Sequence, residues 1–208
     1  MANRPTRLAP CLLAGLTLPF LLPCNTEWAY AQETDARTGS ESSIPRTEDH
    51  KRIAEAAKGP YFVDFRARTA ASWGHAFVWY GKTSERAVEV AGLTPAGDTL
   101  EYILGHVMPV PSDTGASYGD LDPEYLTAHY RVYLNEADAK KVFAYIKKLR
   151  ASTPVWNAET MNCTGFIGSI AEFMGLKTPN RWQRPENYVN NLRAMNGGRQ
   201  IVHLSSAQ

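Results

Sequence analysis

The sequence has few cysteines and almost no excess charge of either sign. Its 208 residues contain three cysteines, and 22 Lys and Arg are nearly balanced by 21 Asp and Glu, for a formal net charge of +1. A chain with so little excess charge has no long-range field that would draw it to nucleic acid or to an anionic membrane. No internal repeat at the spacing of solenoids or propellers is found. We therefore predict a single globular domain that does not bind nucleic acid.

The N-terminal residues 1–31 have the features of a secretory signal peptide. Arg4 and Arg7 precede an apolar stretch that is too short, and too interrupted by proline, to span a bilayer. Ala29 and Ala31 then place small residues at the two positions that signal peptidase reads. We expect cleavage after Ala31, export to the periplasm or the exterior, and a mature protein without an integral membrane anchor.

Removal of the signal peptide leaves Cys163 as the one remaining cysteine, because Cys11 and Cys24 precede the cleavage site. Lipid attachment at Cys24 is a minor alternative, since Pro23 replaces the small residue that such sites use. An exported domain with one cysteine forms no internal disulfide, so a packed core must supply its stability. Cys163 is then a buried apolar residue, an intermolecular cross-link or a reactive thiol.

The mature chain is predicted to begin with a disordered leader, the polar residues 32–49, followed by a single domain over residues 50–208. A short helix is expected at 53–58. Strand signals occur four times, at residues 60–63, 75–80, 87–91 and 129–134. The segment 92–125 is rich in Pro, Gly and Asp, and we expect it to be a long excursion that walls a site, with one strand near 100–104.

Two later segments predict helices with clear N-caps. After Asn135, apolar residues recur at helical spacing as far as Leu149. After Asn162, a second apolar stripe runs to Met174, and Gly175 ends it. Cys163 therefore falls in the first turn of the second helix.

A cysteine at this place has two interpretations. The unpaired N–H groups and the positive end of the helix dipole favour its thiolate, and a nearby imidazolium would lower the pKa further. The same N–H groups can hold the oxyanion of an acyl-transfer intermediate. Against this, Cys163 precedes Phe166 and Ile167 by three and four residues and so lies on the apolar stripe. The helix alone leaves nucleophile and core residue equally open.

His75 is the histidine best placed to act as a base. Of the five histidines, it alone begins a strongly apolar strand, whose alternation puts Phe77 and Trp79 on the same face. The strand is expected to be covered on both sides, and a histidine satisfied by backbone groups is the alternative.

Glu89, in the next strand, is the candidate to orient His75. If Tyr80 pairs with Arg86 in a hairpin, Glu89 lies opposite Phe77, on the face of His75. A one-residue slip would reverse that face. His106 is a rival for the role, and a surface ion pair is the alternative for Glu89.

The motifs that carry these residues are Ser-Trp-Gly-His-Ala-Phe-Val at 72–78, the strand with Glu89, and Asn-Cys-Thr-Gly-Phe at 162–166, followed by Gly-Leu-Lys-Thr-Pro at 175–179. In this order they resemble the circularly permuted branch of the papain-like, NlpC-type cysteine hydrolases. The cysteine motif is similar to the Asp-Cys-Ser-Gly-Phe helix start of bacterial cell-wall peptidases in that superfamily. The excursion at 92–125 has no counterpart in the resemblance.

The resemblance implies an α+β fold in which an antiparallel sheet packs against helices, including the helix of the nucleophile. By the same resemblance Cys163 is the nucleophile, His75 the general base and Glu89 the polar orienter. Trp73 and Asn162, which stand beside the two motifs, are candidate substrate-binding residues. No cofactor is implied.

The resulting hypothesis is an exported cysteine hydrolase or acyltransferase that acts on an amide, peptide-like and from the cell envelope, or on an ester. The alternative is a non-catalytic peptide- or lipid-binding protein that retains the fold. A metal enzyme using His75, Glu89 and His106 is disfavoured, because the sequence has no His-x-x-x-His or paired-cysteine spacing.

Overall fold

The computed structural model describes residues 51, 54, 58–70 and 73–204. Contacts along the chain define two units, and all described residues belong to the second, Ile44–Gln208. The expected signal peptide and leader lie outside the described residues, as does the helix expected at 53–58 except for Ala54 and Lys58.

The described part is an α+β structure in which antiparallel sheets pack against helices, as the sequence predicts. The main sheet has four strands in the order β3-β2-β1-β6, and each neighbouring pair is antiparallel. Its strands are β1 (Tyr61–Arg68), β2 (His75–Lys82), β3 (Glu89–Gly92) and β6 (Leu126–Leu134). A smaller sheet joins β4 (Thr94–Pro95), β5 (Val110–Asp113) and β7 (Val155–Trp156).

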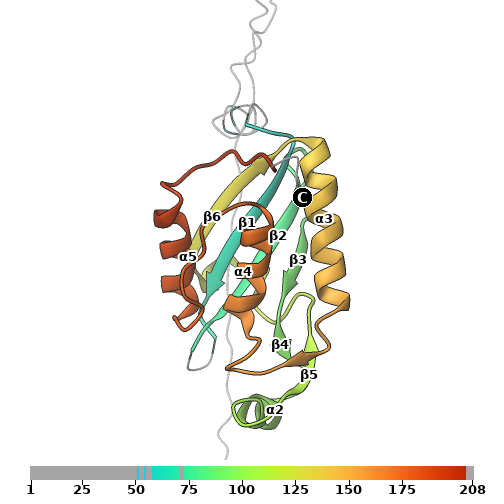
Figure 1. Ribbon diagram of the computed structural model, residues 1–208, viewed down its shortest axis with the longest axis vertical. Coiled ribbons are helices and arrows are strands. Elements are labelled where there is room, and N and C mark those ends of the chain that lie inside the picture. The colour runs from blue at the N-terminus through green and yellow to red at the C-terminus, as the bar shows by residue number, and fades with distance from the viewer. Residues whose placement is uncertain (1–50, 52–53, 55–57, 71–72, 205–208) are drawn as a thin grey trace, which may run out of the picture. The chain divides into compact units, whose positions relative to one another are not determined.

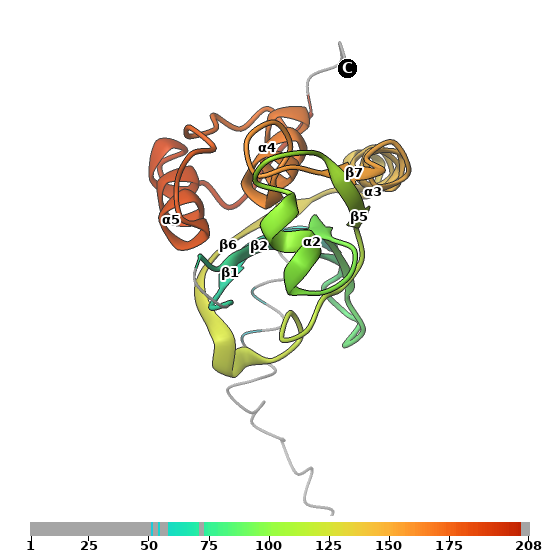
Figure 2. The ribbon, with the colours of Figure 1, turned by 90° about the horizontal axis from the view of Figure 1, so that it is seen from below.

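Three of the helices lie on one face of the main sheet, and a fourth lies at its end. The elements are α2 (Thr99–Leu104), α3 (Glu136–Ala151), α4 (Cys163–Phe173) and α5 (Pro185–Met195), with a 3-10 turn at Pro123–Tyr125. Helices α3, α4 and α5 cover the same face, with α4 against β2 and α5 against β6 and β1 (Figure 1). Helix α2 lies beyond the end of the sheet, beside β5 (Figure 2).

The core fills the space between the helices and the sheet. Alternate residues of β1, including Val63, Phe65 and Ala67, point to this side and are fully buried. Helix α4 supplies Phe166 and Ile170 to the same cluster. Burying such side chains contributes about 1.5–3 kcal/mol each, so this apolar layer fixes α4, and hence its first residue, against β2.

The opposite face of the sheet carries buried charge and aromatic rings. Asp64 is buried and accepts a hydrogen bond from Arg131 at 3.1 Å. The guanidinium of Arg66 lies 3.5 Å from the centre of the Trp79 ring. His75 is on this face too, since its ring stacks on Phe77 at 5.6 Å between centres. The prediction that β2 is covered on both sides is therefore confirmed.

Both predicted helix caps are confirmed. The side chain of Asn135 accepts a hydrogen bond from the N–H of Asp138 at 2.8 Å, and that of Asn162 accepts from Gly165 at 2.9 Å. The strand expected near 100–104 is wrong, because this segment forms α2. Asp98 and Glu101 explain the helix, since the N–H of Asp98 donates to the Glu101 carboxylate at 2.9 Å in the manner of a capping box.

The predicted register of the β2–β3 hairpin is also wrong. Tyr80 pairs with Glu89, not with Arg86, and Phe77 pairs with Gly92. Strand β2 continues to Lys82 and β3 begins only at Glu89, so the connection is longer than expected. Because the shift is by three residues, an odd number, it moves Glu89 to the face opposite His75.

Candidate active site

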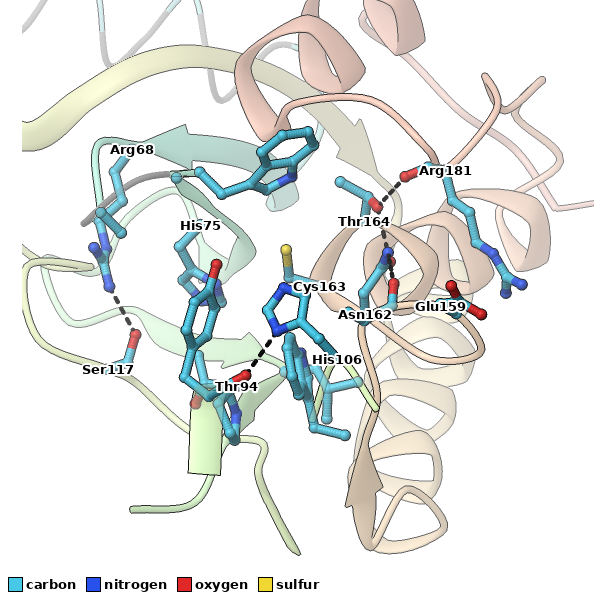
Figure 3. A pocket seen from close by; sticks show the side chains of 18 of the residues that line it. Arg68, His75, Thr94, His106, Ser117, Glu159, Asn162, Cys163, Thr164 and Arg181 are labelled. Carbon is cyan, nitrogen blue, oxygen red and sulfur yellow. Dashed lines mark hydrogen bonds between the residues drawn. The ribbon is translucent and has the colours of Figure 1, made fainter. Parts of the chain in front are cut away.

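A cavity of about 890 Å³ opens where β2 begins and is lined by both Cys163 and His75. Each of these is the first residue of its element, α4 and β2 respectively. The side chain of His75 lies on the face of the sheet that carries the buried charges, whereas α4, which begins with Cys163, packs on the apolar face. Both residues line the cavity because they lie at the same end of the sheet (Figure 3). Five aromatic side chains contribute to the lining, namely Trp73, Tyr102, Tyr118, Trp156 and Trp182.

Backbone groups of Cys163, Thr164 and Ala76 lie close enough to the sulfur of Cys163 to lower the pKa of its thiol. Asn162 uses its side chain to cap the N–H of Gly165, and its carbonyl oxygen accepts from Phe166. The N–H groups of Cys163 and Thr164 are left to interact with the sulfur, and the backbone of Ala76 does so from β2. The contact with Ala76 places the thiol beside the residue that directly follows His75.

The pKa of the Cys163 thiol is nevertheless raised above its ordinary value. Burial is the largest cause, and it outweighs the lowering by the backbone groups of Ala76, Thr164 and Cys163 and by the charge of Arg68. The backbone groups at the start of α4 thus act in the expected direction on the thiol pKa, but burial raises this pKa by more than they lower it. Cys163 stays partly accessible from the cavity.

His75 is buried, yet its Nε2 atom has no hydrogen-bond partner. The nearest acid is Asp120, whose Oδ2 lies 3.8 Å from Nε2. Burial lowers the pKa of His75 to about 4, although the charge of Asp120 opposes the shift. His75 is therefore neutral at pH 7, and the alternative of a histidine satisfied by backbone groups does not hold for Nε2.

Asp120 is held in place by several donors. Arg68 donates to its Oδ1 at 2.6 Å, and both the N–H and the hydroxyl of Ser117 donate to Oδ2, at 2.8 and 3.0 Å. Trp79 donates from its indole to the Asp120 carbonyl oxygen at 3.0 Å. The carboxylate is buried; Ser117 fixes Oδ2, the oxygen that faces His75, and Arg68 fixes Oδ1.

Glu89 does not take the place predicted for it. Its carboxylate accepts a hydrogen bond from the Tyr80 hydroxyl at 2.9 Å, on the opposite face of the sheet from His75. Burial, together with this contact, raises the pKa of Tyr80 to about 12. Asp120, which the sequence analysis did not single out, is instead the carboxylate that lies beside His75.

His106, the rival for the orienting role, lines the same cavity but bonds elsewhere. Its Nδ1 lies 2.8 Å from the carbonyl oxygen of Tyr102, and because that oxygen only accepts, Nδ1 carries the proton. Its ring also packs edge-on against Tyr102 and Trp156. His106 is thus a cavity wall whose Nε2 is left as an acceptor.

The two predicted substrate-binding residues differ in their availability. Trp73 lines the cavity and is 50% exposed, with the Arg184 guanidinium 4.8 Å from its ring centre. Asn162 also lines the cavity, but its amide donates to Ala158 at 2.9 Å and its oxygen caps α4. Trp73 can contact a ligand directly, whereas Asn162 mainly positions Cys163.

Within the described residues, no group of three or more His, Cys, Asp or Glu side chains could hold a metal ion. No helix in that part of the chain is long and apolar enough to cross a membrane. Comparison with family models, curated proteins and solved structures gave no match. The site must therefore be interpreted from its own geometry.

The arrangement has the parts that acyl transfer needs. A thiol and an imidazole share one cavity, backbone groups lie close to the thiol, and a fixed carboxylate stands behind the imidazole. No hydrogen bond joins Cys163 to His75 in the described structure, and such contacts often tighten only when substrate binds. A possible sequence signal for Asp120 is the turn Ser-Tyr-Gly-Asp at 117–120, but many surface turns share that composition.

Proposed function

We propose that this protein is an exported cysteine hydrolase or acyltransferase that acts on an amide or ester bond, with Cys163 as nucleophile and His75 as base. We further propose that its fold is the permuted papain-like, NlpC-type fold that the sequence resembles. The observation that supports the activity best is the unpartnered, buried Nε2 of His75 beside the fixed carboxylate of Asp120, at the cavity that Cys163 lines. Burying an imidazole nitrogen without a partner is unfavourable, and such features concentrate at functional sites.

The reaction starts from a neutral pair. As Sγ of Cys163 attacks the carbonyl carbon, the thiol proton passes to His75, and the carbonyl oxygen becomes an oxyanion near the N–H groups at the start of α4. The imidazolium is stabilised by Asp120, whose charge raises the pKa of His75.

Collapse of this intermediate breaks the bond to the amine or alcohol, which leaves with the proton from His75. Water or another acceptor then attacks the thioester carbonyl and gives its proton to His75. The C–Sγ bond breaks, the carboxylic acid or the new acyl product leaves, and His75 returns the proton to Sγ. Asp120 takes the orienting role that the sequence analysis gave to Glu89. It is therefore a positioning residue, not a catalytic one.

The test is turnover of a small activated ester, p-nitrophenyl acetate, and of a fluorogenic peptide amide by the mature protein. Cys163→Ala should remove turnover of whichever substrate the wild type accepts, while circular dichroism shows an unchanged fold. His75→Gln should reduce kcat by about a hundredfold or more, the usual size of a general-base effect. Equal turnover by Cys163→Ala and wild type would refute the proposal.

A second candidate, a peptide- or lipid-binding protein without chemistry, is favoured by the raised pKa of Cys163 and by the aromatic lining of the cavity. In that case Cys163→Ser should leave ligand binding intact, and neither substrate should be turned over by the wild type.

A further inference from the structure

His106 is a second imidazole in the cavity, and the reaction steps given above assign it no part. It follows α2 and is exposed, whereas His75 is buried. Its Nδ1 donates to the Tyr102 carbonyl oxygen at 2.8 Å, so the lone pair of its Nε2 is left for a molecule in the cavity. Figure 3 shows the ring projecting into the cavity. His106 is therefore a hydrogen-bond acceptor that a small polar molecule can reach.

The ring of His106 is held in place although it is exposed. It packs edge-on against the rings of Tyr102 and Trp156, whose centres lie 4.8 and 5.7 Å from its own. A Cβ atom at Gly105 would overlap the Trp156 ring, so the chain directly before His106 packs closely on that ring. Trp156 itself is buried. The direction of the Nε2 lone pair is thus set by packing as well as by the hydrogen bond of Nδ1.

A short series of hydrogen bonds connects His106 to the start of α4. The N–H of Ala158 donates to the carbonyl oxygen of Gly105, the neighbour of His106, at 3.0 Å. The side-chain amide of Asn162 donates in turn to the Ala158 carbonyl oxygen at 2.9 Å. Asn162 directly precedes Cys163 and caps its helix. The positions of the imidazole and the thiol are therefore fixed relative to each other.

The second half of the reaction needs more than a base. The acyl acceptor has to lose a proton to His75, and it also has to point its lone pair at the thioester carbon. His75 lies in a buried position with its Nε2 toward Asp120, so it offers the acceptor one contact at most. A second contact from a different element would fix the orientation of the acceptor, which is a large part of the rate of such steps.

Two carboxylates of the lining, Asp98 and Glu159, are the rivals of His106 for this contact. Both are exposed. Glu159 is displaced from Cys163 toward Arg181 (Figure 3). An exposed side chain loses rotamer freedom when it orders a ligand, whereas the packed ring of His106 has already lost it. The geometry therefore favours His106.

We propose that Nε2 of His106 holds the acyl acceptor, and that the enzyme consequently favours acceptors with two hydrogens, water and primary amines, over alcohols. This inference rests on the proposed function and names its acceptor class. In hydrolysis the water oxygen bonds to the thioester carbon, one hydrogen passes as a proton to His75, and the other donates to His106. The C–Sγ bond then breaks, His75 returns its proton to Sγ, and the second hydrogen leaves on the carboxylic acid.

An alcohol cannot make both contacts. Its single hydrogen goes to His75, and the lone pairs of its oxygen then face the lone pair of His106 Nε2. A primary amine has a hydrogen for each imidazole, as water does. By microscopic reversibility the amine that leaves in the first half of the reaction can occupy the same place, so the contact also assists the cleavage of an amide.

The experiment follows the acetyl-enzyme formed from p-nitrophenyl acetate. Rapid mixing measures the burst of nitrophenolate, which reports acylation of Cys163, and intact-protein mass spectrometry measures the decay of the acetyl-enzyme in water. His106→Phe keeps a ring against Tyr102 and Trp156 but removes the acceptor atom. Its acetyl-enzyme should decay about tenfold or more slowly, with an unchanged burst, because nitrophenolate leaves without a proton.

Two variants serve as controls. His106→Gln, whose amide oxygen can accept a hydrogen bond at the place of Nε2, should keep most of the wild-type decay rate. His203→Phe should decay as the wild type does, since the His203 side chain is 71% exposed and does not line the cavity.

A second arm adds glycinamide or ethanol to the preformed acetyl-enzyme. The ratio of acetyl transfer to glycinamide over transfer to ethanol should fall by about tenfold or more in His106→Phe, because only the amine loses a contact. An unchanged ratio would overturn the inference.

The inference is also overturned if the acetyl-enzymes of His106→Phe and wild type decay equally fast, or if Glu159→Gln slows the decay instead. Equal losses of burst and decay in His106→Phe, or no rescue by His106→Gln, would show a purely structural role and overturn it as well. In each of these cases an acetyl group on Cys163 leaves the proposed function standing. If the wild type forms no acyl-enzyme from the ester or from the fluorogenic amide, the proposed function fails, and this inference fails with it.

Discussion

Gly92 lies against the imidazole of His75, so closely that a Cβ atom at position 92 would stand 2.8 Å from Nε2 and 3.3 Å from Cε1. The backbone of Gly92 does not have the positive φ that would itself require glycine. Gly92→Ala should therefore leave the strand intact but displace the ring of His75 from its present position beside Asp120. We expect kcat/KM to fall by about tenfold or more, with a stability loss of about 1–3 kcal/mol from overpacking. Ester turnover and thermal unfolding measure the two effects.

Gly115→Ala is the control for this substitution. A Cβ atom there would meet its nearest neighbour, Asp113 Oδ1, at 3.5 Å, an ordinary contact. If Gly92→Ala and Gly115→Ala have the same kcat/KM, the position of the His75 ring does not limit the reaction.

The rate of Cys163 alkylation against pH tests the resting charge state of the site. Because burial raises the pKa of the thiol, the rate for the wild type should still be rising at about pH 9, beyond the midpoint of a free thiol at about 8.5. His75→Gln should give nearly the same profile, since a neutral imidazole adds no charge to the thiol. A plateau below pH 7 that disappears in His75→Gln would instead show a preformed thiolate–imidazolium pair.

The fold could be predicted from the sequence where local signals and burial agree. Asn135 and Asn162 begin helices because a short polar side chain precedes a run of apolar residues at helical spacing. The strand at His75 was predictable from its continuous apolar character. Cys163 and His75 were both placed at element starts by these signals alone.

The orienting residue could not be predicted in the same way. Glu89 was assigned from an assumed hairpin register, and a shift of three residues put it beside Tyr80. Asp120 belongs to the long segment 92–125, whose apolar residues follow no helical or strand periodicity. Its position beside His75 depends on contacts with Arg68 and Trp79, which are distant in the sequence.

His75 should make the stability of the protein depend on pH. Its pKa falls from an ordinary value of 6.5 to about 4 in the fold, so between these values the unfolded chain binds a proton that the native state does not. The contribution is complete above pH 6.5 and is lost progressively as the pH falls to about 4, to an extent of about 3 kcal/mol. His75→Gln does not titrate, so the stability difference between wild type and variant should change by this amount between pH 7.5 and 4. Denaturant unfolding at the two pH values measures it, and a constant difference would contradict the low pKa.

Asn162 and Asn135 offer a matched pair for separating stability from activity. Each caps its helix through one side-chain hydrogen bond to a backbone N–H, and replacing either by Ala should reduce the free energy of unfolding by about 1 kcal/mol. Only Asn162→Ala disturbs the first turn of α4, where Cys163 lies, so only this variant should also reduce kcat. Equal kcat in the two variants would mean that the cap of α4 does not position the nucleophile.

Asp120→Asn tests the positioning of His75 most directly. The side-chain amide of asparagine has one oxygen, so it cannot accept hydrogen bonds from Arg68 at one atom and from Ser117 at the other, as the two carboxylate oxygens do. The buried Arg68 guanidinium is also left without its anionic partner. Breaking a buried pair in this way costs about 3–5 kcal/mol, so the variant must first be shown to be folded by circular dichroism. Loss of the carboxylate charge also removes the one influence that raises the pKa of His75.

The kinetic signature of Asp120→Asn should distinguish positioning from a purely structural role. We expect kcat to fall by about a hundredfold with little change in KM. The His75 pKa of about 4 predicts an acid limb of kcat/KM near pH 4 for the wild type, and this limb should move lower in the variant. Asp122→Asn, a nearby exposed carboxylate whose oxygen accepts from the N–H of Glu124 at 2.9 Å, is the control and should change none of these. A folded Asp120→Asn with the wild-type acid limb would show that Asp120 holds the loop together without acting on His75.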